Sequence, residues 1–261
     1  MLRRLVLGIS AVVFISALAL SLEDRGPIVI LSDEDFTSEN GVVAGSGTPD
    51  DPYVISGWRI ERGDYPFGIY IRGVRVPFLI RDVEIYGAKV AGIKIEASRN
   101  GRVERVRVKG CPAGIMVASS RDLWFREAVV DDCDEGMRVI FSRDISFEKL
   151  HIEDCKVGVW FVGVTNSVVT GSYVEAELGV FLEMASRDNL FFGNGFFAET
   201  PVRTEGGNSW DNGTYGNYWS VFQGWDNDKD GIIDFPFRIH FETVDRYPLV
   251  SFPPPFLDGS H

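Results

Sequence analysis

The chain has 261 residues, 45% of them hydrophobic, with 26 basic and 38 acidic side chains and a formal net charge of −12 at pH 7. A chain of this length and composition can bury a substantial core as a single domain. The acidic balance argues against nucleic acid as a partner, because phosphate backbones are bound by basic faces. An acidic surface suits cation binding, or serves solubility alone.

Residues 1–22 differ in character from the rest of the chain. Arg3 and Arg4 precede an apolar run over residues 5–20, and the small residues at 17 and 19 are typical of a signal-peptide cleavage site. The run is also near the lower length limit of a membrane span, so an uncleaved N-terminal anchor is the alternative. Either way we expect an extracytoplasmic protein: secreted, periplasmic or at the cell surface. Membrane contact is expected only through this segment.

Residues 23–56 form a lead-in of mixed polarity. It contains a turn-forming stretch at residues 45–52, rich in Gly, Pro and Asp, which runs into an apolar stretch. We predict an N-terminal cap over this span.

One pattern then returns five times at a nearly constant interval of about 22 residues, the repeat length of a solenoid. The returns begin at Gly92, Gly114, Gly136, Gly158 and Gly179. A fixed period of this size indicates stacked copies of one small unit, each burying its apolar face against its neighbours. A leucine-rich repeat has a similar length, but the sequence lacks the dense leucine scaffold and helical back of that fold.

Within each return, apolar side chains alternate with others, as at Val159 and Phe161. Period two with β-branched and aromatic residues is typical of β-strands, and no stretch keeps a helical period of 3.6. The sequence therefore predicts an all-β protein, a single right-handed parallel β-helix of about eight coils stacked about 4.8 Å apart. We place the coils at residues 57–207 and a C-terminal capping segment at residues 208–261.

Other side chains recur at the same interval. One set is predicted to form turns between coils, because Asn and Asp tolerate the turn backbone: Asn100, Asp122, Asp144, Asn166 and Asp188. Arginines stand beside this set as exposed neighbours, at Arg99, Arg121, Arg143 and Arg187. The three cysteines, Cys111, Cys133 and Cys155, are predicted to lie in the core as small hydrophobic residues.

A column of carboxylates is one candidate site. It consists of Asp131, Glu153 and Glu175, each one repeat apart, with Asp132 and Asp154 in the next column and His151 two places before Glu153. Like charges on neighbouring strands repel, so a cation, an arginine or a ligand is expected against this column. Paired carboxylates would suit the acid and base of a polysaccharide lyase or hydrolase. The alternative is a solvated strand face whose charges are screened.

A second candidate is apolar and faces outward. If Val159 and Phe161 point into the core, then Trp160 and Val162 point out of it. An exposed strip with aromatic members indicates a binding or self-association surface, and a flat one suits an extended sugar chain. We expect one of three alternatives to cover this strip: a sugar chain, a second solenoid or the C-terminal segment. The predicted ligand-binding residues are Met116, Arg138, Trp160 and Phe181, one per coil.

The sharpest local motif lies in the C-terminal segment. Its carboxylates, at positions 1, 3, 5 and 9 of a loop with glycine at position 6, are Asp226, Asp228, Asp230 and Asp234. Alternating carboxylates of this spacing converge on one calcium ion, and glycine permits the sharp turn. The twelfth residue is Phe237, so the bidentate Glu of a complete EF-hand is missing. We expect structural Ca²⁺ here, and the alternative is an acidic turn without an ion.

The C-terminal segment also carries a family resemblance. It contains Gly216–Ser220 with the letters GNYWS, the Asp-rich loop over residues 226–234, and Asp245–Leu249 with the letters DRYPL. These blocks resemble the signature of NosD-like periplasmic β-helix proteins, although Val221 and Phe222 stand where an acid and a Tyr are common. The resemblance implies a parallel β-helix grouped with carbohydrate-binding and sugar-hydrolysing solenoids.

From these features we expect an exported β-helix that binds carbohydrate or a cell-surface partner without catalysis. One alternative is a lyase or glycoside hydrolase acting on acidic glycans, with Asp131, Glu153, Glu175 and His151 as its candidate residues. The other, implied by the family name, is an accessory role in copper delivery to an exported oxidoreductase. The residues themselves disfavour copper, because the three histidines and four methionines show no clustering.

Overall fold

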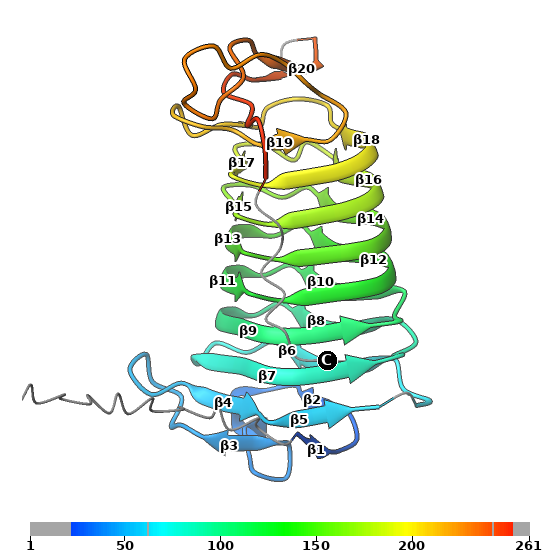
Figure 1. The fold of residues 1–261 in the computed structure, drawn as a ribbon. Coiled ribbons are helices and arrows are strands. Elements are labelled where there is room, and N and C mark those ends of the chain that lie inside the picture. Colours follow the sequence, from blue (N-terminus) through cyan, green and yellow to red (C-terminus); the bar gives the residue numbers. More distant parts are fainter. Residues whose placement is uncertain (1–21, 62, 242, 253–261) are drawn as a thin grey trace, which may run out of the picture.

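The computed structural model describes residues 22–61, 63–241 and 243–252, and the predicted signal segment lies outside them except for residue 22. The described chain is a stack of β-strands that coils from the N-terminal strands at the bottom of Figure 1 to the C-terminal segment at the top. One 3-10 turn is the only helical element among these residues. None of them forms a helix long and apolar enough to cross a membrane.

Nineteen of the described strands belong to one sheet, and two more pair in the C-terminal segment. In chain order the elements are β1 (Glu23–Asp24), β2 (Ile28–Ile30), η1 (Asp33–Asp35), β3 (Val42–Ala44), β4 (Tyr53–Ser56), β5 (Trp58–Ile60), β6 (Phe67–Arg72), β7 (Phe78–Tyr86), β8 (Ala91–Glu96), β9 (Arg99–Lys109), β10 (Ala113–Ala118), β11 (Arg121–Arg126), β12 (Val129–Ile140), β13 (Arg143–Glu148), β14 (His151–Val162), β15 (Val168–Thr170), β16 (Tyr173–Glu183), β17 (Leu190–Phe192), β18 (Gly195–Arg203), β19 (Tyr218–Trp219), β20 (Phe237–His240) and β21 (Thr243–Asp245).

Strands of successive coils pair in parallel at the predicted interval. Ile93 in β8 lies opposite Ile115 in β10, Ile115 lies opposite Met137 in β12, and Val159 in β14 continues the row. All four side chains are buried. The prediction of an all-β parallel helix of about eight turns is confirmed.

An aromatic column runs through the core. Phe125 stacks on Phe147 with ring centroids 5.0 Å apart, and Phe147 meets Phe161 at 5.8 Å. Phe191 continues the column to Trp210, with centroids 4.6 Å apart. All five rings are buried. Aromatic pairs of this kind add about 0.5–1.5 kcal/mol beyond their burial, so the column ties successive coils together.

The recurring glycine is required by the close stacking of the coils. A Cβ on Gly136 would lie 2.7 Å from the carbonyl oxygen of Gly158 and 2.5 Å from the side chain of Ile152. Gly92 and Gly114 have the same surroundings, with the next carbonyl oxygen at 2.9 and 2.7 Å. Any side chain at these positions would push two coils apart, so steric exclusion explains the repeated glycine.

The turns between coils are formed as the sequence predicts. Five residues at these corners, at or just before the start of a strand, have positive φ, between 53° and 61°: Asn100, Asp122, Asp144, Asn166 and Asp188. Such angles suit Asn and Asp because their short polar side chains bond locally. Behind these turns, buried serine hydroxyls link the coils. Ser120 Oγ accepts the Ser98 backbone N–H at 3.1 Å and donates to the Ala118 carbonyl oxygen at 2.8 Å.

Parallel stacking starts within the lead-in segment. β1 pairs with β5 and β2 pairs with β6, both in parallel, while β3 and β4 form an antiparallel pair. Ile28 and Ile30 of β2 are fully buried. Strands of the lead-in therefore contribute core residues to the first coils.

The C-terminal segment is joined to the last coil through one buried carboxylate. Asp245 Oδ2 accepts the Asn217 backbone N–H at 2.7 Å and the Trp219 indole N–H at 2.9 Å. Asp245 Oδ1 accepts the Tyr247 backbone N–H at 3.1 Å. A Cβ on Gly216 would lie only 1.8 Å from Asp245 Oδ1, so this position must be glycine. These contacts join the GNYWS and DRYPL blocks into one closing structure.

Two asparagine pairs continue the serine ladder at the top of the stack. Asn217 Oδ1 accepts the backbone N–H of Asn194 at 3.1 Å and its amide N–H at 2.9 Å. Asn217 Nδ2 donates to the Trp210 carbonyl oxygen at 2.8 Å. Asn208 accepts from Asn189 in the same way. The ladder therefore ends on amides that bond back to the solenoid.

Candidate functional site

The outward column predicted to bind ligand forms a ladder of stacked charged and aromatic side chains. Its members, Met116 of β10, Arg138 of β12, Trp160 of β14 and Phe181 of β16, lie in register on neighbouring strands. The Arg138 guanidinium carbon lies 4.4 Å from the ring centroid of Trp160, which stacks on Phe181 at 5.4 Å. Sequence reasoning missed Arg203 of β18, which lies 5.4 Å over the Phe181 ring. Its position one repeat after Phe181 is the signal that could have found it.

This ladder is less exposed than the sequence predicts. Its four predicted members are half-buried, and Val162 in the next outward column is only 7% exposed. The prediction of an exposed Val162 is wrong, because Ile140 and Glu183 flank its short side chain from the neighbouring strands. Stacking also covers the ring faces. The ladder therefore presents ring edges and charged groups to solvent, and not the flat strip that was expected.

Polar groups hold the ladder in place. Trp160 Nε1 donates to Glu183 Oε1 at 3.0 Å, and Arg138 donates to Glu135 Oε1 at 3.3 Å. Burial raises the pKa of Glu135, and the positive charge of Arg138 acts against that rise. The outer edge of the ladder thus combines apolar ring edges with ordered hydrogen-bonding groups.

Neighbouring side chains lie against the negative charges of the predicted carboxylate column. Asp131 of β12 lies opposite Lys109 of β9, and Lys109 Nζ lies 2.5 Å from Asp131 Oδ2. This bond raises the pKa of Lys109. Glu153 Oε2 lies 2.8 Å from His151 Nε2, without the alignment of a hydrogen bond. Sequence reasoning missed Lys109, although it stands one repeat before Asp131.

His151 and Glu175 belong to an aromatic stack on the same face. His151 is 8% exposed, and its ring stacks on Tyr173 with centroids 4.8 Å and planes 8° apart. The Tyr173 hydroxyl donates to Glu175, and burial together with this bond raises the pKa of Tyr173. Tyr173 also contacts Phe197 at 4.8 Å. Each candidate acid or base of the column thus contacts a neighbour, and these contacts single out no carboxylate pair for catalysis.

Asp132 and Asp154 line an acidic groove at one corner of the solenoid. The groove has a volume of about 1060 Å³, and its other acidic residues are Asp134, Glu175, Glu177 and Glu199. The three cysteines also border it, are buried as predicted, and form no disulfide. Their thiols donate to backbone carbonyl oxygens two residues earlier in the chain, at 3.6, 3.4 and 3.2 Å.

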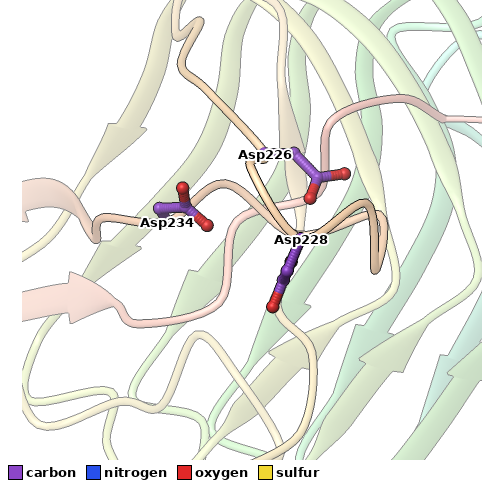
Figure 2. Close-up of side chains that lie close together, drawn as sticks. All are labelled: Asp226, Asp228 and Asp234. Carbon is purple, nitrogen blue, oxygen red and sulfur yellow. The ribbon is translucent and has the colours of Figure 1, made fainter.

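The Asp-rich loop between β19 and β20 gathers three of its four carboxylates. Figure 2 shows the side chains of Asp226, Asp228 and Asp234 close together in this loop, and one oxygen of each lies within 4.8 Å of the others. The fourth, Asp230, instead accepts the Ile232 backbone N–H at 2.8 Å. The charge of Asp230 raises the pKa of Asp228. A divalent cation would relieve this repulsion.

The loop turns back on its first carboxylate. Asp226 accepts the backbone N–H of Asp230 at 3.1 Å and that of Gly231 at 3.0 Å. Gly231 has a φ of +89°, in the left-handed region that glycine adopts without strain. This conformation explains the glycine at the sixth position of the motif.

We expect Ca²⁺ to stabilise the folded protein through this loop. Ion binding to the folded state alone adds about 2.7 kcal/mol at a hundredfold excess over the dissociation constant, so a chelator should lower the Tm. The Asp228→Ala variant should melt at one temperature with and without chelator. Asp188→Ala, which removes an exposed carboxylate elsewhere, should respond to chelator as the wild type does. A wild-type Tm that is the same in Ca²⁺ and in chelator would exclude the ion.

The fold and these surface features define a parallel β-helix that carries charged and aromatic side chains on its outer faces and corners. A family model described as periplasmic copper-binding protein (NosD) matches residues 65–224, more than half of the chain. The chain therefore belongs to the NosD family.

Curated relatives match a shorter stretch. A protein of Pseudomonas aeruginosa, described as a probable ABC transporter binding protein NosD, is 33% identical over 92 residues, which are 33% of this chain and 21% of the relative. A protein of Stutzerimonas stutzeri with the same description is 32% identical over 95 residues, again 33% of this chain and 21% of the relative. The match thus spans about a fifth of the length of these relatives. A solved alginate lyase from Paenibacillus sp. str. FPU-7 is similar at a TM-score of 0.43 and 12% identity, over 74% of this chain and 76% of that chain.

The family description implies copper, and the described side chains do not fit it. Copper(I) favours thiolate and thioether ligands, and copper in general also takes imidazole. Among the described Asp, Glu, His and Cys residues, the only three ligand atoms that lie within 4.8 Å of one another are in the Asp-rich loop, whose oxygens suit Ca²⁺. Burial raises the pKa of Cys155 to about 11, and a bond with Cys111 together with burial raises that of Cys133. Thiolates are therefore disfavoured at neutral pH.

Proposed function

We propose that this protein is an exported, non-catalytic member of the NosD family that binds carbohydrate or another cell-surface component. The binding surface is the ladder of Arg138, Trp160, Phe181 and Arg203, and the observation that carries the proposal is its continuous stack of cations and rings. Export is supported by the apolar run that follows Arg3 and Arg4, and by the periplasmic description of the family.

The ladder offers the two kinds of contact that a sugar chain uses. Ring edges of Trp160 and Phe181 provide apolar surface, while the guanidinium groups of Arg138 and Arg203 provide donors. Glu183, which accepts from the Trp160 indole, adds an acceptor beside them. Ligand sites commonly combine aromatic surface with a few placed polar groups. A ligand extended along the solenoid axis would meet one of these side chains per coil, about every 4.8 Å.

The candidate acids and bases support binding without catalysis. Asp131 is engaged by Lys109, and Glu175 accepts the Tyr173 hydroxyl. A general acid and base must have different proton affinities and a free position beside the reacting bond. Carboxylates held in this way serve as parts of a stable strand face.

Replacing Trp160 with alanine should weaken binding of the recognised glycan by roughly 1–3 kcal/mol, as loss of an aromatic anchor does. The glycan is identified on an array of neutral and acidic glycans, and affinity is then measured by isothermal titration well below the Tm of the variant. The half-burial of Trp160 makes this precaution necessary.

Trp124→Ala is the matched control for that measurement. Trp124 of β11 is also half-buried, and an arginine also stacks on it: the guanidinium carbon of Arg126 lies 5.7 Å from the centroid of its ring. It stands on a different face, so its removal should leave glycan affinity unchanged. Equal losses in the two variants, or an array without any bound glycan, would contradict the proposal.

A further inference from the structure

A basic groove lies at the corner where β8, β10 and β12 turn into β9, β11 and β13. It has a volume of about 560 Å³ and is lined by four arginines, Arg75, Arg99, Arg121 and Arg143, and by no carboxylate. Its charge is opposite to that of the whole chain, which carries −12. The turn residues beside these arginines explain the fold of the corner, but not the gathering of cations there.

The strand register places three of the arginines directly above one another. Arg99, Arg121 and Arg143 are paired neighbours in β9, β11 and β13, so they repeat about every 4.8 Å. Like charges opposite one another repel. Asp122 Oδ2 lies 3.6 Å from Arg121 Nε, and Asp144 Oδ2 lies 2.5 Å from Arg143 Nη1. The positive charges of Arg121 and Arg143 are therefore offset in part.

Arg99 lacks the neighbour that offsets the charge in the next two coils. Asn100 follows it where Arg121 and Arg143 are followed by aspartate. The aspartate that offsets the charge in the next two coils is thus absent beside Arg99, and the terminal N–H groups of its guanidinium are available to pair with an anion. The lower end of the groove is therefore the part most in need of an anionic ligand.

The three buried serines of the groove are occupied by the fold. Ser98 Oγ accepts the Val74 backbone N–H at 3.1 Å and donates to the Glu96 carbonyl oxygen at 2.8 Å. Ser120 and Ser142 repeat this arrangement one and two coils further along. The groups left for a ligand are guanidinium N–H donors, whose planar fork matches a carboxylate, together with the hydroxyls of Ser119 and Thr165.

An exposed aromatic ring borders the same groove. Phe141 is 59% exposed, and its ring occupies space beside Gly163, where a Cβ would lie 2.7 Å from it. One ring next to a row of arginines suits a sugar ring that carries a carboxylate. A nucleic acid strand would instead use successive aromatic platforms for its bases, and the lining of this groove holds the single ring of Phe141.

We propose that this groove binds acidic polysaccharide, a chain whose sugar units carry carboxylates, along the row from Arg75 to Arg143. The groove is lined by residues other than those of the ladder around Trp160, so the proposal does not depend on binding at that ladder.

The test measures binding of polygalacturonate oligosaccharides to the folded protein at low salt. The double variant Arg99→Gln/Arg121→Gln should lose roughly tenfold to a hundredfold in affinity, as expected for the loss of charged hydrogen bonds. Its Tm should stay equal or rise, because two like charges in register are removed. The control Arg81→Gln/Arg102→Gln removes the same charge from exposed arginines outside the groove and should keep wild-type affinity.

Two further probes complete the test. Fully methyl-esterified oligosaccharides lack the carboxylates and should not bind, while Trp124→Ala, at a residue outside both the groove and the ladder, should bind polygalacturonate as the wild type does. Equal losses in the two double variants would overturn the proposal, because net charge alone would explain them. Absence of binding would overturn it too, as would tighter binding of single-stranded oligothymidylate, which would assign the groove to nucleic acid.

Discussion

Replacing Asp245 with alanine is expected to release the C-terminal segment from the last coil. The buried carboxylate accepts hydrogen bonds from Asn217, Trp219 and Tyr247, and truncation leaves these three donors without a partner. Each buried donor left unsatisfied costs about 1–3 kcal/mol, so the free energy of unfolding should fall by roughly 3–9 kcal/mol. Urea denaturation followed by tryptophan fluorescence measures this loss, because Trp219 itself lies at the site.

Asp64→Ala serves as the control for Asp245→Ala. Asp64 is exposed and pairs with the exposed Lys89, so its removal should change the free energy of unfolding by less than about 0.5 kcal/mol. A loss for Asp245→Ala that is no larger than this would mean that other contacts hold the segment.

Asp245 should also make the stability depend on pH. Burial raises its pKa to about 6 from the ordinary 3.8, while its three hydrogen bonds act in the opposite direction. The folded protein therefore holds this proton more tightly than the unfolded chain does. The resulting stabilisation is complete below about pH 4 and is lost as the pH rises through about 6, a decrease on the order of 3 kcal/mol. The Asp245→Asn variant should lack this component, and the difference between the two pH profiles isolates it.

Replacing Phe161 with alanine should lower the free energy of unfolding by about 3–5 kcal/mol, the usual result of removing a fully buried ring. The ring lies in the middle of the aromatic column and contacts Phe147 and Phe191, with centroids 5.8 Å away in both cases. Coils above and below cannot close the gap, since the strand ladders fix their spacing. Urea denaturation at constant m-value would report the loss.

The neighbouring residue supplies the comparison for Phe161. Trp160 points the opposite way and is half-buried, so Trp160→Ala should cost clearly less than Phe161→Ala. If both substitutions cost the same, the ladder of Trp160 is part of the interior, and the carbohydrate proposal loses its main residue.

The period of the sequence made the fold predictable, because contacts in a solenoid join residues that are one repeat apart. Ile93 meets Ile115, and Arg138 meets Trp160, as the repeat interval requires. The turn conformation of Asp122 followed from residue type and position in the same way, and its φ is 53°.

Contacts that do not follow the period could not be predicted from the sequence. Asp245 bonds to Asn217 and Trp219, which lie 28 and 26 residues before it and outside the repeat. The half-burial of Trp160 could not be predicted either, because it depends on how the rings and guanidinium groups stack. The calcium motif was visible as a spacing, but only the folded structure places Asp230 apart from the other three carboxylates.

The ladder of serines and asparagines gives the solenoid a direction. Ser98 donates its backbone N–H to Ser120 one coil further along, and Ser120 donates to Ser142 in the same sense. A stack of this kind has an upper end where another chain could add its own coil, as exposed sheet edges allow. Asn217 and Asp245 turn the last bonds back into the same molecule. The closing structure should therefore act as a barrier to end-to-end polymerisation at the C-terminal end of the stack.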